Sequence, residues 1–352
     1  MGSNVGIALD ATHTIAHTAV QNRSMANGGD MNADRVVALV RGAAKSLPLL
    51  PSVYRRLRPP PSQIISSTAS YCYGVWAKHL SSAHDSTGCP VPDVVLEMGP
   101  GVSLALGVAA LLSGAKKYIG ADAVPLLSPG ATANAASQLV QMFQARAKVT
   151  FEGWPDFSGL LDERGFPSSA IPEETLSESL EIARVASILD AANLAPSGVP
   201  PAEELLSYIA PFFRSSVQPN SVDFALSHSV LEHVDNLAST LSTLFLWLKP
   251  GGLMSHQVDF RSHNITRSWD GHRAYNSVAW KVVLKGRRYP VNRFPCSLVI
   301  AEIEKAGFQV IKALRNRTPP TLRRSELCRE WRNVSDEDIE TESLFIQARK
   351  PL

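Results

Sequence analysis

Apolar residues in the middle of the chain alternate between short β-branched runs and longer helical stretches. Val94–Leu96 is a short, wholly apolar run, which is typical of a buried parallel strand. The apolar stretch Leu104–Ser113 predicts a helix that Gly114 ends, and Tyr118–Ala121 predicts a second strand. A strand, a helix and a strand in close succession form a βαβ unit, whose connection is nearly always right-handed.

A second strand–helix–strand pattern begins at residue 222. Val222–Leu226 and Leu253–Val258 read as strands. Between them Asp235 or Asn236 can cap a helix, and Lys249–Gly252 ends it. Apolar residues recur on one face of this helix at Leu237, Leu241, Leu244, Phe245 and Leu248.

The C-terminal part predicts one more helix and two final strands. Leu298–Lys305 has a helical pattern that Gly307 stops, and Phe308–Ala313 and Leu344–Ala348 read as strands. Alternating strands and helices are typical of the α/β class. We therefore expect a three-layer domain with helices on both faces of a mostly parallel sheet.

The chain divides into three stretches. Residues 1–35 lack an apolar period and predict a flexible tail, 36–90 predict an N-terminal helical extension, and 91–352 predict the main domain. Two segments interrupt its alternation, at about 151–207 and 260–296. We expect these insertions to form a lid over the carboxyl edge of the sheet.

The two insertions differ in charge. Residues 151–207 hold 11 acidic and 2 basic residues, whereas 260–296 hold 8 basic and 1 acidic. Docking of the two against each other is the most economical interpretation. Because 260–296 also contains Trp269, Tyr275, Trp280 and Tyr289, a pocket for an anionic or sugar-like molecule is an alternative, and nucleic-acid binding ranks last.

Composition narrows the class of protein. The 352 residues are 45% hydrophobic and 19% charged, as in a soluble globular protein, and the net charge of +2 argues against a polyanion-binding protein. The four cysteines form no C-x-x-C pair, so we expect no metal site. Because they also suggest no disulfide framework, we expect a reducing, cytoplasmic location. The apolar run Leu104–Leu112 is too short to span a membrane, and no secretory signal is visible.

The segment Val94–Ser103 carries the strongest chemical signal. The strand ends at Glu97, and Gly99 and Gly101 let a ligand approach the backbone where the next helix begins. Asp122 lies 21 residues after Gly101 at the end of the second strand, where an acid suits a ribose diol. Leu104 stands where a dinucleotide fingerprint needs its third glycine, and no P-loop is present.

Three motifs in the expected order resemble the class I S-adenosylmethionine-dependent methyltransferases. Glu97–Gly101 looks like their motif I, Ser227–Val234 resembles the segment after their fourth strand, and Leu248–Gly252 resembles the turn before their fifth. Ser103 departs from the family, many of whose members have a glycine there. The resemblance covers about residues 92–150, 208–260 and 297–350. It implies a Rossmann-like sandwich with a seven-stranded, mostly parallel sheet.

The resemblance also implies roles for matching residues. Glu97 would orient the methionine amino group of S-adenosylmethionine, Asp122 would accept from the ribose hydroxyls, and Ala123 would lie near adenine. Gly99, Pro100 and Gly101 would line the methionine and ribose, and Ser227 and His228 would lie beside the sulfonium. No acidic residue follows Tyr208–Pro211, the expected third strand, so its adenine contact has no candidate.

Candidates for the acceptor side come from the ends of the fourth and fifth strands. His228, Asp259 and His263 are the expected catalytic residues, because histidine suits proton transfer near neutral pH. His233 and His256 each have a packing role as an alternative. Glu232, His233, His256 and Asp259 together offer oxygen and nitrogen ligands for a metal, but their spacing is unspecific.

The function expected from the sequence is methyl transfer from S-adenosylmethionine to an oxygen or nitrogen of a small-molecule or glycosyl-type acceptor. Two alternatives remain open: a methyltransferase-like binding or scaffold protein without turnover, and a nicotinamide-dependent oxidoreductase. No membrane or nucleic-acid partner is expected. Neither the acceptor nor the oligomeric state follows from the sequence.

Overall fold

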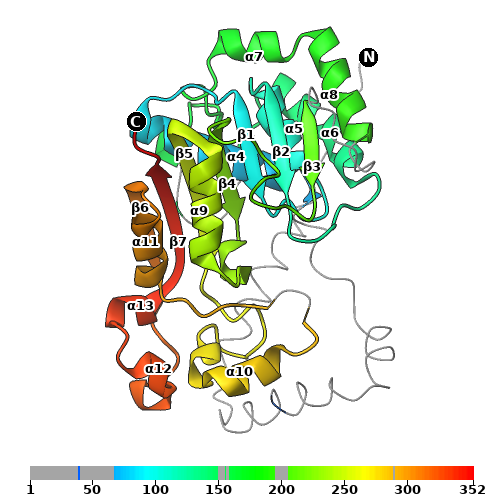
Figure 1. Ribbon diagram of the computed structural model, residues 1–352. Coiled ribbons are helices and arrows are strands. Elements are labelled where there is room, and N and C mark those ends of the chain that lie inside the picture. Colours follow the sequence, from blue (N-terminus) through cyan, green and yellow to red (C-terminus); the bar gives the residue numbers. More distant parts are fainter. Residues whose placement is uncertain (1–38, 40–66, 150–154, 156–157, 195–204, 288–289) are drawn as a thin grey trace, which may run out of the picture. The chain divides into compact units, whose positions relative to one another are not determined.

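A computed structural model describes residues 39, 67–149, 155, 158–194, 205–287 and 290–352 (Figure 1). The chain forms two compact units. The sheet unit comprises 57–260, 292–318 and 335–352, and the second unit comprises 1–56, 261–291 and 319–334. The predicted tail, most of 36–66, and parts of the acidic segment lie outside the described residues.

A seven-stranded sheet organises the sheet unit, in the order β3-β2-β1-β4-β5-β7-β6. Strands β1 to β5 run parallel, whereas β7 pairs antiparallel with both β5 and β6. The expected Rossmann-like, mostly parallel sheet with a closing hairpin is therefore confirmed. The strands are β1 (Val94–Met98), β2 (Lys117–Ala121), β3 (Leu206–Ile209), β4 (Val222–His228), β5 (Leu248–Asp259), β6 (Gln309–Arg317) and β7 (Thr341–Arg349).

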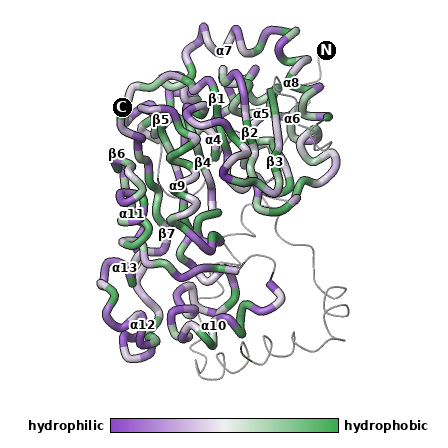
Figure 2. The backbone as a smooth tube through the Cα atoms, viewed as in Figure 1, coloured by the Kyte–Doolittle hydropathy of each residue, from purple (hydrophilic) through white to green (hydrophobic). Residues whose placement is uncertain are grey.

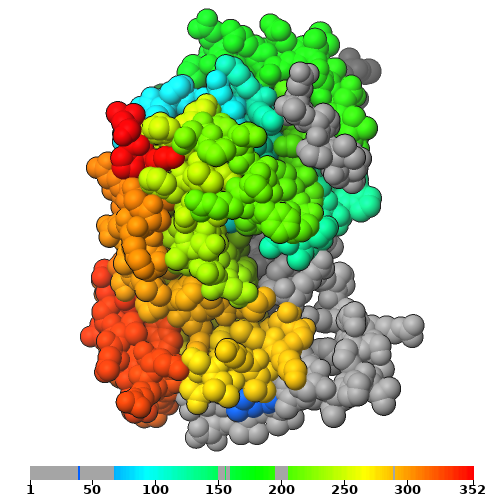
Figure 3. All heavy atoms as spheres, viewed as in Figure 1, coloured from blue at the N-terminus to red at the C-terminus, as the bar shows by residue number. Residues whose placement is uncertain are grey.

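Helices cover both faces of this sheet, and successive residues of a strand pack against the helices of opposite faces. Val95 packs into a core with α4, α5, α6 and α8, whereas the next residue, Leu96, packs into a core with α9 and α11. Figure 2 shows α5 and the central strands coloured hydrophobic and α7 coloured hydrophilic. Figure 3 shows α9 and α11 side by side on one face. The helices are α4 (Ala69–Thr87), α5 (Ala105–Leu112), α6 (Ala131–Gln144), α7 (Glu173–Ser179), α8 (Ile182–Leu194), α9 (Leu237–Trp247), α11 (Cys296–Lys305) and α13 (Asp336–Glu340).

The predicted elements match most of these bounds, but β3 begins at Leu206 and ends at Ile209 instead of covering Tyr208–Pro211, the two final strands are longer than predicted, and β5 begins early. Asn236, and not Asp235, caps α9, because its side chain accepts the N–H of Ser239 at 3.0 Å. Helix α9 ends at Trp247, and β5 begins at Leu248 instead of Leu253. The predicted turn 249–252 is thus an outward loop within β5. Its residues hydrogen-bond to Lys350, which keeps them in the sheet.

The acidic segment contributes to the main core. Its helix α8 buries Ile188 and Ala192 among residues of α5 and α6. Glu173 at the start of α7 pairs with Arg146, which follows α6. Part of this segment is therefore the connection that leads from β2 to β3.

The second unit is built around a buried arginine. Arg273 is 1% exposed, and its guanidinium lies 4.7 Å from the ring of Trp269 and 4.8 Å from that of Trp331. Tyr275 and Trp280 belong to the core of this unit. These aromatic residues of the basic segment therefore have packing roles. The elements of the unit are η5 (Gly271–Ala274), α10 (Ser277–Leu284), η6 (Arg324–Glu326) and α12 (Arg329–Arg332).

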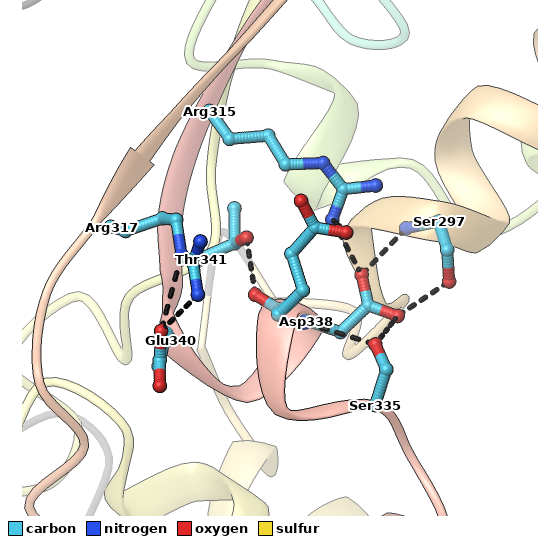
Figure 4. Close-up of polar contacts among 8 residues, drawn as sticks. Ser297, Arg315, Arg317, Ser335, Asp338, Glu340 and Thr341 are labelled. Carbon is cyan, nitrogen blue, oxygen red and sulfur yellow. Dashed lines mark hydrogen bonds and ion pairs between the residues drawn. The ribbon is translucent and has the colours of Figure 1, made fainter.

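A buried carboxylate joins the closing hairpin to α11 (Figure 4). Asp338 is 4% exposed and accepts the backbone N–H of Ser297 at 2.8 Å, which caps the start of α11. Arg315 of β6 donates to the same oxygen at 3.2 Å, and Ser335 donates to the other at 3.1 Å. Among the described residues, no helix is long and apolar enough to cross a membrane.

Replacing Asp338 with alanine should destabilise the sheet unit by about 2–4 kcal/mol, because a cap is lost and Arg315 loses a buried partner. Glu340 is the matched control. It pairs with Arg317 across the same hairpin, but both side chains are partly exposed, so Glu340→Ala should cost about 0–1 kcal/mol. Urea unfolding of both variants checks this, and equal losses would contradict it.

Candidate functional site

The turn between β1 and α5 contains two glycines, and a different structural feature accounts for the absence of a side chain at each. Gly99 and Gly101 have φ angles of +72° and +71°, which side chains rarely adopt. A Cβ at Gly99 would lie 2.7 Å from Val230, so close packing excludes a side chain there. A Cβ at Gly101 would meet no heavy atom within 4 Å. The backbone at Gly101 is therefore open to a ligand.

Glu97 lies buried in β1 just before this turn. It is 7% exposed, and the hydroxyl of Tyr118 in β2 donates to its Oε2. Tyr118 reaches this position because Gly107 of α5 has no side chain, since a Cβ there would lie 2.4 Å from the Tyr118 ring. Burial raises the pKa of Glu97 to about 8, and the charge of Asp122 adds to the increase. Such a carboxyl group gains most from a cation placed beside it.

Asp122 bridges three elements at the same edge. Its Oδ2 accepts the N–H of Gly101 at 3.2 Å and the hydroxyl of Tyr208 in β3 at 3.1 Å. Burial raises the pKa of Asp122 to about 6, although both of these hydrogen bonds act to lower it. Within the described residues, both donors to this carboxylate use the same oxygen. The other oxygen can accept from a ligand.

The remaining residues expected at the cofactor site differ in exposure. Ala123 is exposed directly after Asp122, and Pro100 is half-buried in the glycine turn. Ser227 is fully buried, and its hydroxyl lies 2.7 Å from Nδ1 of His256 in β5. His256 is therefore a packed histidine of the sheet, as its alternative interpretation had it.

His228 ends β4 beside a polar group from helix α4. Nδ1 of His228 lies 3.3 Å from Nε2 of His79, and its ring meets that of Tyr71 edge to face at 5.9 Å. In the sheet, His228 pairs with Gln257 of β5. Burial lowers the pKa of His228 to about 3, the charge of Lys78 lowers it further, and that of Asp259 raises it.

Lys78 brings a buried amine to this group. It is 1% exposed, and its Nζ donates to Oε1 of Gln257 and lies 5.5 Å from the centre of the Phe345 ring. Burial lowers the pKa of Lys78 to about 7. An amine with such a pKa can give or take a proton near neutral pH.

The other expected residues belong to different elements of the chain. Asp259 is buried at the end of β5 in the sheet unit, whereas His263 belongs to the second unit. Glu232 and His233 form a separate 3-10 turn (η4, Leu231–His233) and not the first turn of α9. Among the described residues of the sheet unit, the set Glu232, His233, His256 and Asp259 does not gather its ligand atoms as a metal site.

Sequence reasoning gave no role to several residues that the structure places at this edge, among them Tyr118, Tyr208, Lys78, His79 and Gln257. Tyr208 was located on the third strand but given no role, although it bonds Asp122. Lys78 and His79 lie in a helix whose inward face is unusually polar, and this was the available signal. Gln257 lies between two buried residues of β5, and its side chain accepts a hydrogen bond from Lys78 of α4.

Comparison with known proteins identifies a family. A family model described as a methyltransferase domain matches residues 73–313. A search of curated proteins finds no match.

Several solved structures are similar to the chain. A putative methyltransferase in complex with the Trm112 activator, from Haloferax volcanii, is 14% identical with a TM-score of 0.36, covering 80% of this chain and 98% of that one. A putative S-adenosylmethionine-dependent methyltransferase from Listeria monocytogenes is 13% identical with a TM-score of 0.35, covering 77% and 99%. A putative sarcosine dimethylglycine methyltransferase from Galdieria sulphuraria is 12% identical with a TM-score of 0.40, covering 78% and 85%.

Replacing Lys78 with methionine should stabilise the protein most at pH 7 and below. The folded pKa of about 7 lies below the ordinary lysine value of 10.5, so the wild type gains stability as pH rises between these values and loses it as pH falls to about 7. The variant lacks this dependence. The difference in unfolding free energy should therefore shrink from pH 7 to pH 10, as urea titrations can measure. A constant difference would contradict the burial argument.

Proposed function

Because the chain belongs to the class I S-adenosylmethionine-dependent methyltransferase family, we propose that the turn after β1 and the end of β2 bind S-adenosylmethionine and that the end of β4 holds the methyl acceptor. The chain is an enzyme, and family membership favours methyl transfer over the oxidoreductase and scaffold alternatives. The observation that supports this placement of the cofactor is the open backbone at Gly101, whose N–H donates a hydrogen bond to Asp122.

The residues at this edge fit the cofactor. A Cβ at Gly101 would occupy free space, so the backbone there can pass close to the methionine or ribose. Asp122 offers an oxygen to ribose hydroxyls, and Glu97 offers a buried carboxylate to the methionine ammonium. Pro100, Ala123, Ser227 and His228 complete the proposed cofactor set. S-adenosylmethionine, when bound, supplies an electrophilic methyl group on a sulfonium.

The protein's part in the reaction is alignment and proton handling. In-line displacement needs the acceptor lone pair placed behind the methyl carbon, and holding both partners in place supplies much of the rate. An acceptor that loses a proton also needs a group to take it. His228 and Asp259 lie at the ends of adjacent strands β4 and β5, and Lys78 adds an amine from α4.

The acceptor is proposed to be an oxygen or nitrogen of a small or glycosyl-type molecule. Histidines and carboxylates at the strand ends suit both atoms, since either requires proton transfer at near-neutral pH. We propose His228 and Asp259 as residues of the acceptor side in the sheet unit, and the catalytic role expected for His263 of the second unit stays a prediction. Alanine at Asp259 or His263 should then lower turnover with S-adenosylmethionine binding intact.

Calorimetry should detect micromolar binding of S-adenosylmethionine, equivalent to about −8 kcal/mol. Asp122→Ala should weaken it at least tenfold, because the ribose loses an acceptor. Gly101→Ala should weaken it similarly by filling the ligand's space. Gly88 is the matched control, because it has a φ of +66° and no neighbour within 4 Å of a Cβ but ends α4 away from the turn. Gly88→Ala binding as weakly as Gly101→Ala would refute the placement.

Binding should also release protons, because the methionine ammonium would hold Glu97 ionised. With its pKa at about 8, Glu97 is mostly protonated at pH 7, so binding of the ammonium should release about one proton there. Calorimetry in two buffers of different ionisation enthalpy counts these protons. Glu97→Gln should remove the release at pH 7, and a release that persists in this variant would assign it elsewhere.

A further inference from the structure

Four side chains from three strands and a helix form a continuous row beside the proposed acceptor site. They are Gln347 of β7, Ser255 of β5, His79 of α4 and His228 of β4. Gln347, Ser255 and His79 are 2%, 0% and 0% exposed. Because solvent is excluded, each of their protons must find a partner within the protein.

The orientation of the Gln347 amide starts the row. Its amide nitrogen lies 3.2 Å from the backbone oxygen of His79, and a carbonyl oxygen can only accept. The amide oxygen on the other side accepts the hydroxyl of Ser82 at 3.2 Å. The amide nitrogen therefore faces Ser255 as well, and it donates to Oγ of Ser255 at 3.0 Å.

Ser255 passes this direction on to His79. Its hydroxyl accepts from Gln347, and the one acceptor within reach of its own proton in the described residues is Nδ1 of His79, at 2.7 Å. A proton on Nδ1 would leave this buried hydroxyl without an acceptor, which is costly. His79 is neutral, because burial and the nearby His228, Lys78 and His256 lower its pKa. Its single proton is therefore on Nε2.

His79 in turn determines the tautomer of His228. Nε2 of His79 lies 3.3 Å from Nδ1 of His228, so the protonated Nε2 donates and Nδ1 accepts. His228 is also neutral near pH 7, although the charge of Asp259 favours its protonated form. With Nδ1 occupied as an acceptor, its proton lies on Nε2.

We infer that Gln347, Ser255 and His79 are positioning residues that fix His228 as the Nε2–H tautomer, so that His228 serves the methyl acceptor as a hydrogen-bond donor and not as the base. A donor there binds one lone pair of an acceptor oxygen and leaves another lone pair to attack the methyl carbon. Removal of the acceptor's proton then falls to another group of the site. The inference depends on the proposed function only for the place of the acceptor.

Long-range proton–nitrogen spectra of the full chain with 15N-labelled histidine test the tautomers directly, because protonated and unprotonated ring nitrogens resonate far apart. His79→Gln and His228→Gln identify the two sets of signals. At pH 7.5, both histidines should carry the proton on Nε2. A proton on Nδ1 of His228 in the wild type would overturn the inference.

Ser255→Ala should remove the preference for the Nε2–H tautomer, so that a measurable share of His79 and His228 adopts the Nδ1–H form. Ser81 is the matched control. It is a serine of α4, the helix that carries His79, it is 3% exposed, and its hydroxyl has no hydrogen-bond partner among the described residues, so Ser81→Ala should leave both spectra unchanged. Unchanged tautomers in a folded Ser255→Ala protein would overturn the relay. If that variant does not fold, Gln347→Glu, which replaces the donating nitrogen by an oxygen, takes its place.

Titration of the same wild-type sample with S-adenosylmethionine keeps the two proposals apart. Absence of binding would count against the proposed function and leave the tautomers standing. The wrong tautomer in a protein that binds the cofactor would refute the relay alone.

Discussion

Removal of charged groups from water is the constraint on which the carboxyl edge of this sheet depends. Glu97, Asp122 and Lys78 are each less than a tenth exposed, and burial is the largest influence on the pKa of each. Burial disfavours the charged form, so it raises the pKa of the carboxyl groups and lowers the pKa of the amine, in both cases toward neutral pH. The groups thereby become responsive to any charge that a bound molecule brings. If the same residues were well solvated, they would have ordinary pKa values and would attract a charged ligand much more weakly.

Packing around the edge produces this burial. Gly107 lets the ring of Tyr118 lie against α5, and from there its hydroxyl reaches Glu97. Helix α4 covers the ends of β4 and β5 with a face that is polar and buried at once, which brings Lys78 and His79 to His228. Lys78, His79 and Ser82 on that helix make hydrogen bonds, whereas the buried hydroxyl of Ser81 makes none within the described residues. The helix thus closes the sheet and furnishes part of its chemistry.

Most strands and helices of the sheet unit, and the positions of Glu97 and Asp122 at strand ends, were predictable from the sequence, because both depend on local patterns. Apolar runs and glycine turns determine where β1, β2 and β4 begin and end, and the end of a parallel strand places Glu97 and Asp122 on one edge. The buried polar group around His228 was only partly predictable. His79 and His228 are 149 residues apart, and Gln347 lies 268 residues from His79, so no spacing rule links them. The start of β5 was placed late because the loop 249–252 has the composition of a turn, although it stays paired with the C-terminal strand.

Strand β7 is synthesised after β6 but lies between β6 and β5. Strand β6 therefore has no place on the sheet until β7 is present, and during synthesis the edge of β5 stays unpaired until the end of the described sequence has been made. Because Gln347 lies on β7, the row that leads to His228 is completed in the same event. The assembly of this sheet edge and the completion of the row from Gln347 to His228 are therefore one step.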